Sequence, residues 1–296
     1  MSSYTGKPDP VTGRATTGHE WNGIEELETP IPRLVFFFLG AAALFAVICW
    51  ILYPTWPLVW SYTRGALGTD QRSVVTRQVE EAAAERSAWT ARVMDESPAD
   101  VAADPALMRL VNEAGHTLFV DNCAACHGTR ATGGLGFPNL TAKAWLWGDG
   151  SPEAIEETIR IGINSTNDDT RASQMLAFGR DGVLDTQKID AVVAYVRSLS
   201  GLKPAAGDDA ARIEAGRQVF ADNCASCHGE EAKGNRDLGA PDLTDANWLY
   251  GSDAYSVFTT VYGGRQGHMP HWGARLSPLD TRILALYVHG LTRPAQ

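Results

Sequence analysis

The pattern Cys-x-x-Cys-His occurs twice in this chain of 296 residues, at Cys123 to His127 and at Cys224 to His228. Its two thiols lie about one helical turn apart, so both can form thioethers to the vinyl groups of one haem, while the adjacent imidazole binds the iron. A thioredoxin-like dithiol needs a βαβ context and a structural zinc site needs further ligand pairs, and the surrounding sequence offers neither. The pattern predicts two covalently bound haem c groups and a role in electron transfer.

The predicted attachment and ligand residues follow directly from the motif. The thioether-forming side chains are Cys123, Cys126, Cys224 and Cys227, and the proximal iron ligands are His127 and His228. The fifth cysteine, Cys49, lies in an apolar run without a partner, so we expect it to be a small buried hydrophobic residue.

The sixth iron ligands are the next question, because they set the redox potential. Met175 is the only methionine between His127 and His228, and no histidine lies between them, so Met175 is the expected sixth ligand of the first haem. For the second haem the candidates are His268, Met269, His271 and His289. Met269 is preferred by alignment, since both methionines are followed by two residues, an aromatic residue and glycine. His/Met ligation raises the potential relative to bis-His ligation and fills both axial positions.

Two repeats carry these sites, and their pattern predicts tandem helical domains. The stretch from Gly115 to Asn122 before the first motif matches the stretch from Gly216 to Asn223 before the second. Each repeat closes on an amphipathic helix, over residues 186–199 and 279–291. We expect a first haem domain at residues 107–200, a linker at 201–207 and a second haem domain at 208–296.

This layout resembles the class I cytochrome c fold, a small all-α cup around one haem. In that fold, a glycine and an aromatic residue of the N-terminal helix pack across an aromatic residue of the C-terminal helix. The resemblance implies two such contacts, one in each repeat: Gly115 and Phe119 with Tyr195, and Gly216 and Phe220 with Tyr287.

An apolar segment precedes the repeats. Residues 34–63 contain no formal charge, and the 20 residues from Leu34 to Tyr53 would span about 30 Å as a helix. Because a polar stretch of 33 residues comes first, the segment is predicted to be a retained transmembrane anchor rather than a cleaved signal peptide. The expected organisation is an arm at residues 1–33, the transmembrane helix and its exit at 34–60, and a polar helical linker at 61–106.

Charge and topology narrow the possible partners and location. The formal net charge of -10 excludes a general nucleic-acid binder and favours a cationic partner. More basic residues follow the apolar segment than precede it, which by itself points the haem domains toward the cytoplasm. However, c-type haem is attached outside the bacterial inner membrane, and long domains cross largely regardless of charge. We therefore expect a single-pass inner-membrane protein with a cytoplasmic N-terminus and periplasmic haem domains.

Two further segments carry a more specific resemblance. The stretch from His19 to Glu28 with Arg33, and the stretch from Tyr53 to Trp60, are similar to the arm and helix exit of the di-haem, CcoP/FixP-like subunit III of cbb3-type cytochrome c oxidases. In that family the subunit takes electrons from a donor cytochrome c and passes them to a mono-haem cytochrome c subunit. That partner feeds a catalytic haem-copper subunit in a proton-translocating oxidase. The resemblance implies that this chain is not an enzyme on its own.

Two other functions remain open from the sequence. The chain could be a stand-alone membrane-anchored di-haem shuttle or the cytochrome subunit of a periplasmic dehydrogenase. It could also be an anchor or assembly protein whose haems are incidental. The patterned arm and the proline-rich helix exit favour the oxidase, because a shuttle has no evident need for them.

Overall fold

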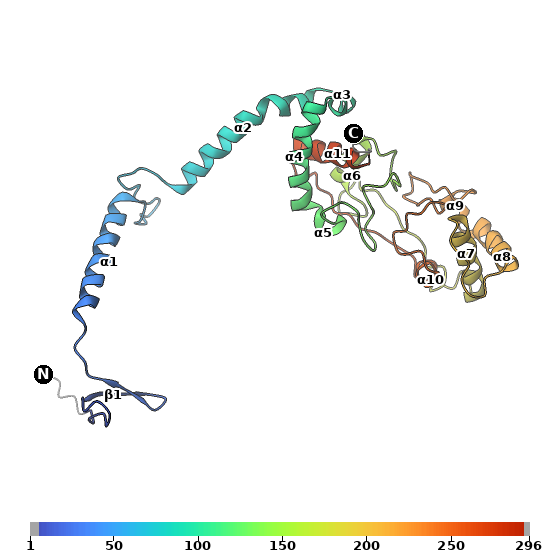
Figure 1. Ribbon diagram of the computed structural model, residues 1–296. Coiled ribbons are helices and arrows are strands. Elements are labelled where there is room, and N and C mark those ends of the chain that lie inside the picture. The colour runs from blue at the N-terminus through green and yellow to red at the C-terminus, as the bar shows by residue number, and fades with distance from the viewer. Residues whose placement is uncertain (1–5, 293–296) are drawn as a thin grey trace. The chain divides into compact units, whose positions relative to one another are not determined.

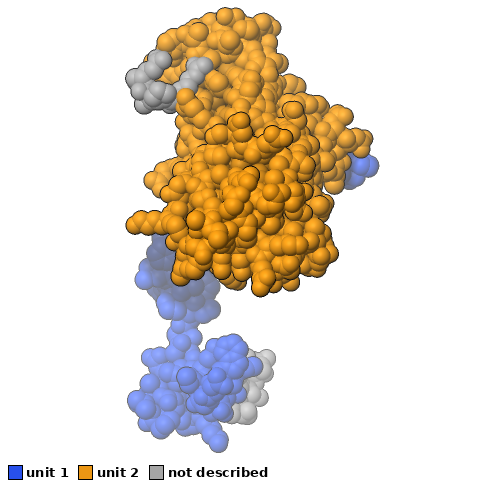
Figure 2. Space-filling model, turned by 90° about the vertical axis from the view of Figure 1, so that its right-hand side faces the viewer, with its two compact units in different colours: residues 1–85 blue, residues 86–296 orange. Residues whose placement is uncertain are grey.

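The structure is a computed structural model that describes residues 6–292. The first five residues of the predicted arm and the last four of the predicted second haem domain lie outside the described residues. The chain divides into two compact units, residues 1–85 and 86–296 (Figure 2). Helices dominate the described chain, which confirms the predicted all-α class.

A short β-hairpin in the arm is the exception to the helical pattern. Strands β1 (Thr16–Trp21) and β2 (Ile24–Leu27) pair antiparallel. Asn22 and Gly23 join them with φ angles of 51° and 82°. Two central residues with positive φ are typical of the two-residue turns whose twist matches that of the strands, and Asn-Gly is their commonest sequence. This local signal was available in the sequence, but the sequence analysis did not predict the hairpin.

Helix α1 (Arg33–Leu52) is the predicted transmembrane helix. Within the described chain it is the one helix long and apolar enough to cross a membrane. The chain then folds back over its C-terminal end, where the backbone N–H groups of Ala66 and Leu67 donate to the carbonyls of Ile51 and Leu52 at 2.8 and 3.1 Å. These bonds satisfy carbonyls that a helix end leaves unpaired. Helix α2 (Gln71–Asp95) follows as the predicted polar helix.

After α2, the described part of the second unit contains nine helices, and eight of them belong to the two repeats. The ninth is a short helix, α3 (Pro98–Ala103), which precedes the first repeat. The first repeat contributes α4 (Pro105–Asn122), α5 (Ala124–His127), α6 (Pro152–Ile161) and α7 (Thr186–Leu199). The second repeat contributes α8 (Ala210–Asn223), α9 (Ala225–His228), α10 (Ala254–Gly263) and α11 (Pro278–Leu291).

Side-chain caps define where these helices begin. The carboxylate of Asp104 accepts hydrogen bonds from the backbone N–H groups of Ala106 and Leu107 at the start of α4. Asp209 caps α8 in the same way, and Ser277 caps α11 with Pro278 at the first helical position. Such caps satisfy donors that the helix itself leaves unpaired, and proline fits the first turn because its missing N–H is not needed there.

The closing helices of the two repeats are exchanged. Helix α11 packs against α4 and α6, which together form the first bundle, and α7 packs against α8 and α10, which form the second bundle (Figure 1). The ring centroids of Phe119 and Tyr287 lie 5.7 Å apart, and those of Phe220 and Tyr195 lie 5.5 Å apart. The expected contacts, Phe119 with Tyr195 and Phe220 with Tyr287, are therefore wrong.

Two glycines confirm the exchanged pairing by their close helix contacts. A Cβ atom on Gly115 would lie 2.6 Å from the Cβ of Tyr287, and one on Gly216 would lie 2.8 Å from the Cβ of Tyr195. The physical reason lies in the connection between the repeats. The ten residues 200–209 connect α7 to α8, and consecutive helices in a chain are usually neighbours in space. Once α7 packs against α8, α4 is left to pack against α11.

Each bundle has its own apolar core. In the first bundle the core includes Phe119, Ile155, Ile159, Leu284 and Val288. In the second bundle it includes Ile189, Val192, Phe220, Val257 and Val261. A third cluster joins the end of α2 and α3 to α4 and α11 through Val93, Val101, Leu107, Val111, Ile283 and Leu286. Both bundles therefore contain side chains from both repeats.

Candidate haem sites

The two Cys-x-x-Cys-His motifs have the same local geometry. Helix α4 ends at the first motif, where the N–H of Cys123 donates to the carbonyl of Phe119 at 2.8 Å, and the N–H of His127 returns to the carbonyl of Cys123 at 3.0 Å. The second motif repeats both bonds, from Cys224 to Phe220 at 2.8 Å and from His228 to Cys224 at 2.9 Å. This single helical turn is the spacing that two thioether bonds to one haem require.

Both motif histidines are oriented by a backbone carbonyl. The Nδ1–H of His127 donates to the carbonyl of Pro138 at 3.2 Å, and that of His228 donates to the carbonyl of Pro241 at 3.0 Å. Because a carbonyl only accepts, Nε2 of each ring carries a free lone pair for a metal. Burial lowers the pKa of both imidazoles, although the carbonyl contact acts in the opposite direction. The neutral ring is the form that ligates iron.

The motif cysteines differ in their exposure. Burial, with a smaller contribution from the neighbouring thiol, raises the pKa of Cys123 to about 11, and the same causes raise the pKa of Cys224 to about 11. These two side chains are therefore uncharged at neutral pH. Cys126 and Cys227 are exposed. A thioether is also uncharged, so the partly buried positions of Cys123 and Cys224 suit covalent attachment of an apolar group better than a thiolate–metal site.

Both motifs open into one continuous cavity with a volume of about 680 Å³. Its walls are mainly apolar and include aromatic side chains from both repeats, among them Trp145, Trp147, Trp248 and Tyr250. Concave apolar cavities with a few directed polar groups are typical of cofactor sites. The directed groups here are the imidazoles of His127 and His228, so the residues present fit haem c.

The methionine segments cross between the repeats, as the closing helices do. Met269 packs against the core of the first bundle, which contains Phe119 and against which Cys123 also packs, although Met269 belongs to the second repeat. It forms a reciprocal pair of backbone hydrogen bonds with Ile163, just after α6, both at 2.9 Å. The first bundle thus contains one motif histidine and the methionine of the other repeat.

Met175 makes the equivalent crossing in the other direction. It packs against the core of the second bundle, which contains Phe220 and against which Cys224 also packs. Its backbone pairs with that of Arg265, just after α10, through hydrogen bonds of 2.8 and 3.2 Å. Met175 thus packs in the other bundle from His127, whose site the sequence analysis expected it to complete. The sequence repeat does not enclose its own site, because residues 162–185 lead from α6 in the first bundle to α7 in the second.

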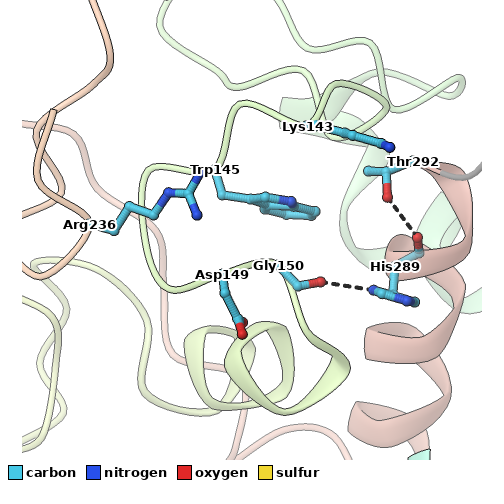
Figure 3. Close-up of a pocket in the computed structure, with 7 residues that line it drawn as sticks. All are labelled: Lys143, Trp145, Asp149, Gly150, Arg236, His289 and Thr292. Atoms are coloured by element: carbon cyan, nitrogen blue, oxygen red, sulfur yellow. Dashed lines mark hydrogen bonds between the residues drawn. The ribbon is translucent and has the colours of Figure 1, made fainter. Parts of the chain in front are cut away.

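The three competing histidines differ in their surroundings. His271 is partly buried, but it is not among the residues that line the cavity. His268 is exposed, although it reaches the rim of the cavity. His289, on α11, hydrogen-bonds through Nδ1 to the carbonyl of Gly150 at 2.8 Å. It lines a second cavity of about 400 Å³ together with Trp145, Lys143 and Arg236 (Figure 3). Met269 is partly buried and lines the cavity that contains His127.

Two arginines that lie over aromatic residues of the cavity wall were missed by the sequence analysis, and one of them, Arg265, itself lines the cavity. The guanidinium of Arg265 lies over the ring of Tyr250 at 4.1 Å from its centroid, and that of Arg171 lies over Trp147 at 5.2 Å. Neither position stands out in the sequence, because the two arginines do not align between the repeats. Their equivalence exists only in three dimensions.

Comparison with known proteins decides the family. A model of the N-terminal domain of the cbb3 oxidase protein FixP matches residues 13–59, a cytochrome c model matches residues 112–200, and a model of cbb3-type cytochrome c oxidase subunit III matches residues 211–288. The chain is 47% identical to the cbb3-type cytochrome c oxidase subunit FixP of a Bradyrhizobium species, over 96% of each chain. It is 45% identical to subunit CcoP of Cereibacter sphaeroides, over 93% of this chain and 94% of the relative.

The chain belongs to the FixP/CcoP family of cbb3-type cytochrome c oxidase subunits. It is thus an electron-transfer subunit of an oxidoreductase complex, with cytochrome c domains that bind haem c covalently. Family membership together with the apolar helix α1 makes it a membrane-anchored protein. The family predicted from the sequence is confirmed, and the stand-alone shuttle is not favoured.

Proposed function

We propose that this FixP/CcoP-type chain holds two haem c groups, each completed by a methionine from the other repeat. The first is attached to Cys123 and Cys126 and ligated by His127 and Met269. The second is attached to Cys224 and Cys227 and ligated by His228 and Met175. The exchange of the closing segments between the bundles carries this proposal, because Met269 packs against the same apolar core as Cys123 and Met175 packs against the same apolar core as Cys224.

The function of these sites is electron relay within the oxidase. Bound haem supplies a one-electron iron centre. Each haem would be held by one histidine and one methionine of this chain, a ligand pair that suits electron transfer and disfavours oxygen binding. The carbonyls of Pro138 and Pro241 hold the imidazoles in one orientation, so little rearrangement accompanies a change of charge.

The chain takes electrons from a donor cytochrome c and delivers them to a mono-haem cytochrome c subunit, which serves the catalytic haem-copper subunit. Oxygen reduction and proton translocation belong to those partners, and this chain alone is not an enzyme. Residues 107–200 and 208–296 are the two sequence repeats, and each haem site takes residues from both of them. Residues 1–33 face the cytoplasm and both bundles face the periplasm of a bacterium, with α1 as the single span of the inner membrane.

Haem counting tests the attachment sites directly. A pyridine haemochrome assay of the full-length chain should report two haems, and Cys123→Ala with Cys126→Ala should leave one. Cys49→Ala is the matched control, since this cysteine lies in α1 and should leave the count at two. Two haems in the double variant would refute the assignment of the motif.

Native purification tests the complex. Co-elution of this chain with haem b and copper, at constant ratio through successive columns, is the expected result. Isolation of the chain by itself with full reactivity toward several acceptors would support the shuttle instead.

A further inference from the structure

Two guanidinium groups occupy equivalent places in the two bundles. In the second bundle, Nε and Nη2 of Arg265 donate to the hydroxyl of Thr260 at 3.1 and 2.9 Å. In the first bundle, Nε of Arg171 donates to the hydroxyl of Thr158 at 3.1 Å. Each guanidinium also covers an aromatic ring, that of Tyr250 or Trp147.

The threonines hold the arginines in a defined orientation. The hydroxyl of Thr158 donates to the carbonyl of Ala154 at 2.8 Å, and that of Thr260 donates to the carbonyl of Ser256 at 2.9 Å. With its hydrogen engaged in this way, each hydroxyl can only accept from the arginine. Both threonines line the haem cavity, and so does Arg265 itself.

The arginines reach these places from different positions in the two repeats. Thr158 and Thr260 are equivalent, because the backbone carbonyl of each accepts a hydrogen bond from the N–H of the glycine that ends its helix, Gly162 or Gly264. Arg265 follows Gly264 directly, whereas Gly162 is followed by Ile163 and the cation comes from Arg171 farther along the chain. The same charge at the same place, supplied by non-equivalent residues, indicates that the site requires a cation there.

Neither arginine has a carboxylate partner of its own. Both are partly buried, and among the described residues no aspartate or glutamate oxygen lies within 4.0 Å of their nitrogens. The pKa of Glu157 is lowered mainly by Arg160, and Arg171 makes only a small contribution to this shift. The carboxylate of Glu157 is already bound by Arg160 through two hydrogen bonds of 2.8 and 2.7 Å. A partly buried cation without an anion is unfavourable.

The group expected in this cavity supplies the missing anion. Haem is apolar except for two propionate carboxylates, and guanidinium is the side chain whose planar donors best match a carboxylate. We propose that Arg265 and Arg171 are propionate-binding residues, Arg265 for the haem attached to Cys224 and Arg171 for the haem attached to Cys123. The inference rests on the proposed function and adds the residues that orient each haem and tune its potential.

The expected direction of the effect follows from charge. A fixed positive charge beside the porphyrin disfavours the oxidised, more positive iron, and neutralising a propionate acts in the same direction. Arg265→Gln removes the cation and exposes the propionate charge, so it should lower one of the two potentials. Arg171→Gln should lower the other one. A tenfold change in the ratio of oxidised to reduced iron corresponds to about 59 mV for one electron, and a shift of about this size is expected.

The test is a redox titration of the purified full-length chain with both haems bound. Arg265→Lys keeps the charge and should restore most of the potential. Arg275→Gln is the matched control, because Arg275 also lies over an aromatic ring, that of Trp272 at 4.6 Å, but is exposed. It should leave both potentials unchanged.

The haem count and the methionine-to-iron absorption band, recorded on the same samples, separate the two levels of the proposal. If the unmodified chain lacks two haems, the proposed function and this inference both fail. If two haems and the band are retained while Arg265→Gln and Arg171→Gln leave both potentials unchanged, or shift the same one, the propionate assignment alone is wrong.

Discussion

Gly115→Ala tests the exchanged pairing of α4 with α11 by adding a single methyl group. The new Cβ would lie 2.6 Å from the Cβ of Tyr287, whereas carbon atoms in favourable contact are about 3.5–4.0 Å apart. The two helices must therefore separate by about 1 Å at this contact. Because both backbones are rigid here, rotation of a side chain cannot relieve the clash.

The size of the effect follows from this separation. A radial gap of 0.5–1 Å forfeits about a quarter to a half of the dispersion energy of the atoms involved. Overpacking of this kind costs about 1–3 kcal/mol. Alanine favours the helix over glycine by about 0.5–1 kcal/mol, which offsets part of the loss. We expect a net decrease of about 1–2 kcal/mol in the free energy of unfolding.

Urea unfolding of the haem-loaded chain, followed by circular dichroism, measures this free energy. Gly290→Ala on α11 is the matched control, since a Cβ there would meet Asn112 and Met108 only at 3.8 Å. It should be neutral or stabilising by up to about 1 kcal/mol through helix propensity. A Gly115→Ala variant as stable as this control would refute the close contact.

A double-mutant cycle identifies the partner helix. Gly115→Ala and Tyr287→Ala should be non-additive by about 0.5–3 kcal/mol, because residues in contact share their energy. Gly115→Ala and Tyr195→Ala should be additive within about 0.5 kcal/mol. Coupling to Tyr195 instead of Tyr287 would restore the pairing that the sequence suggests and overturn the exchange.

Three further outcomes are expected. In the single-haem chain made by Cys123→Ala and Cys126→Ala, Met175→Ala should abolish the methionine-to-iron band, whereas Met269→Ala should leave it unchanged. The opposite result would show that each methionine ligates the haem of its own repeat. A chain ending at residue 200 should fail to form a His/Met haem, because α11 and Met269 are missing; such a haem in its spectrum would contradict the crossing. Reduction by a basic cytochrome c should slow as ionic strength rises from 0.01 to 0.15 M, which shortens the Debye length from about 30 to about 8 Å; a flat stopped-flow rate would indicate apolar docking.

The haem-binding chemistry was predictable because it depends on short stretches of chain. Cys123 to His127 forms one helical turn, and its spacing is enough to predict two attachment sites and one imidazole. Length and composition were likewise sufficient for α1, since a span of the bilayer needs about 20 apolar residues. The arm contained an equally local signal, Asn22-Gly23, that the sequence analysis did not use.

The two arginines proposed to bind propionates could not be predicted from short stretches of sequence. Arg265 and Arg171 act in equivalent places, but nothing in the repeat alignment relates them. Their equivalence depends on Thr158 of α6 and Thr260 of α10, whose hydroxyls accept hydrogen bonds from Arg171 and Arg265 in the folded chain. Interactions between residues brought together by a loop of unpredicted path leave no regular pattern in a sequence.

The sequence by itself determined the parts of this protein: the two motifs, the two methionines, the glycine and aromatic pairs and the membrane helix. It did not determine which parts combine, because the repeats carry the same pattern and Gly115 is as complementary to Tyr195 as to Tyr287. Tertiary structure decided between them through connectivity. The short connection at residues 200–209 makes α7 pack against α8, and α11 with Met269 must then complete the other bundle.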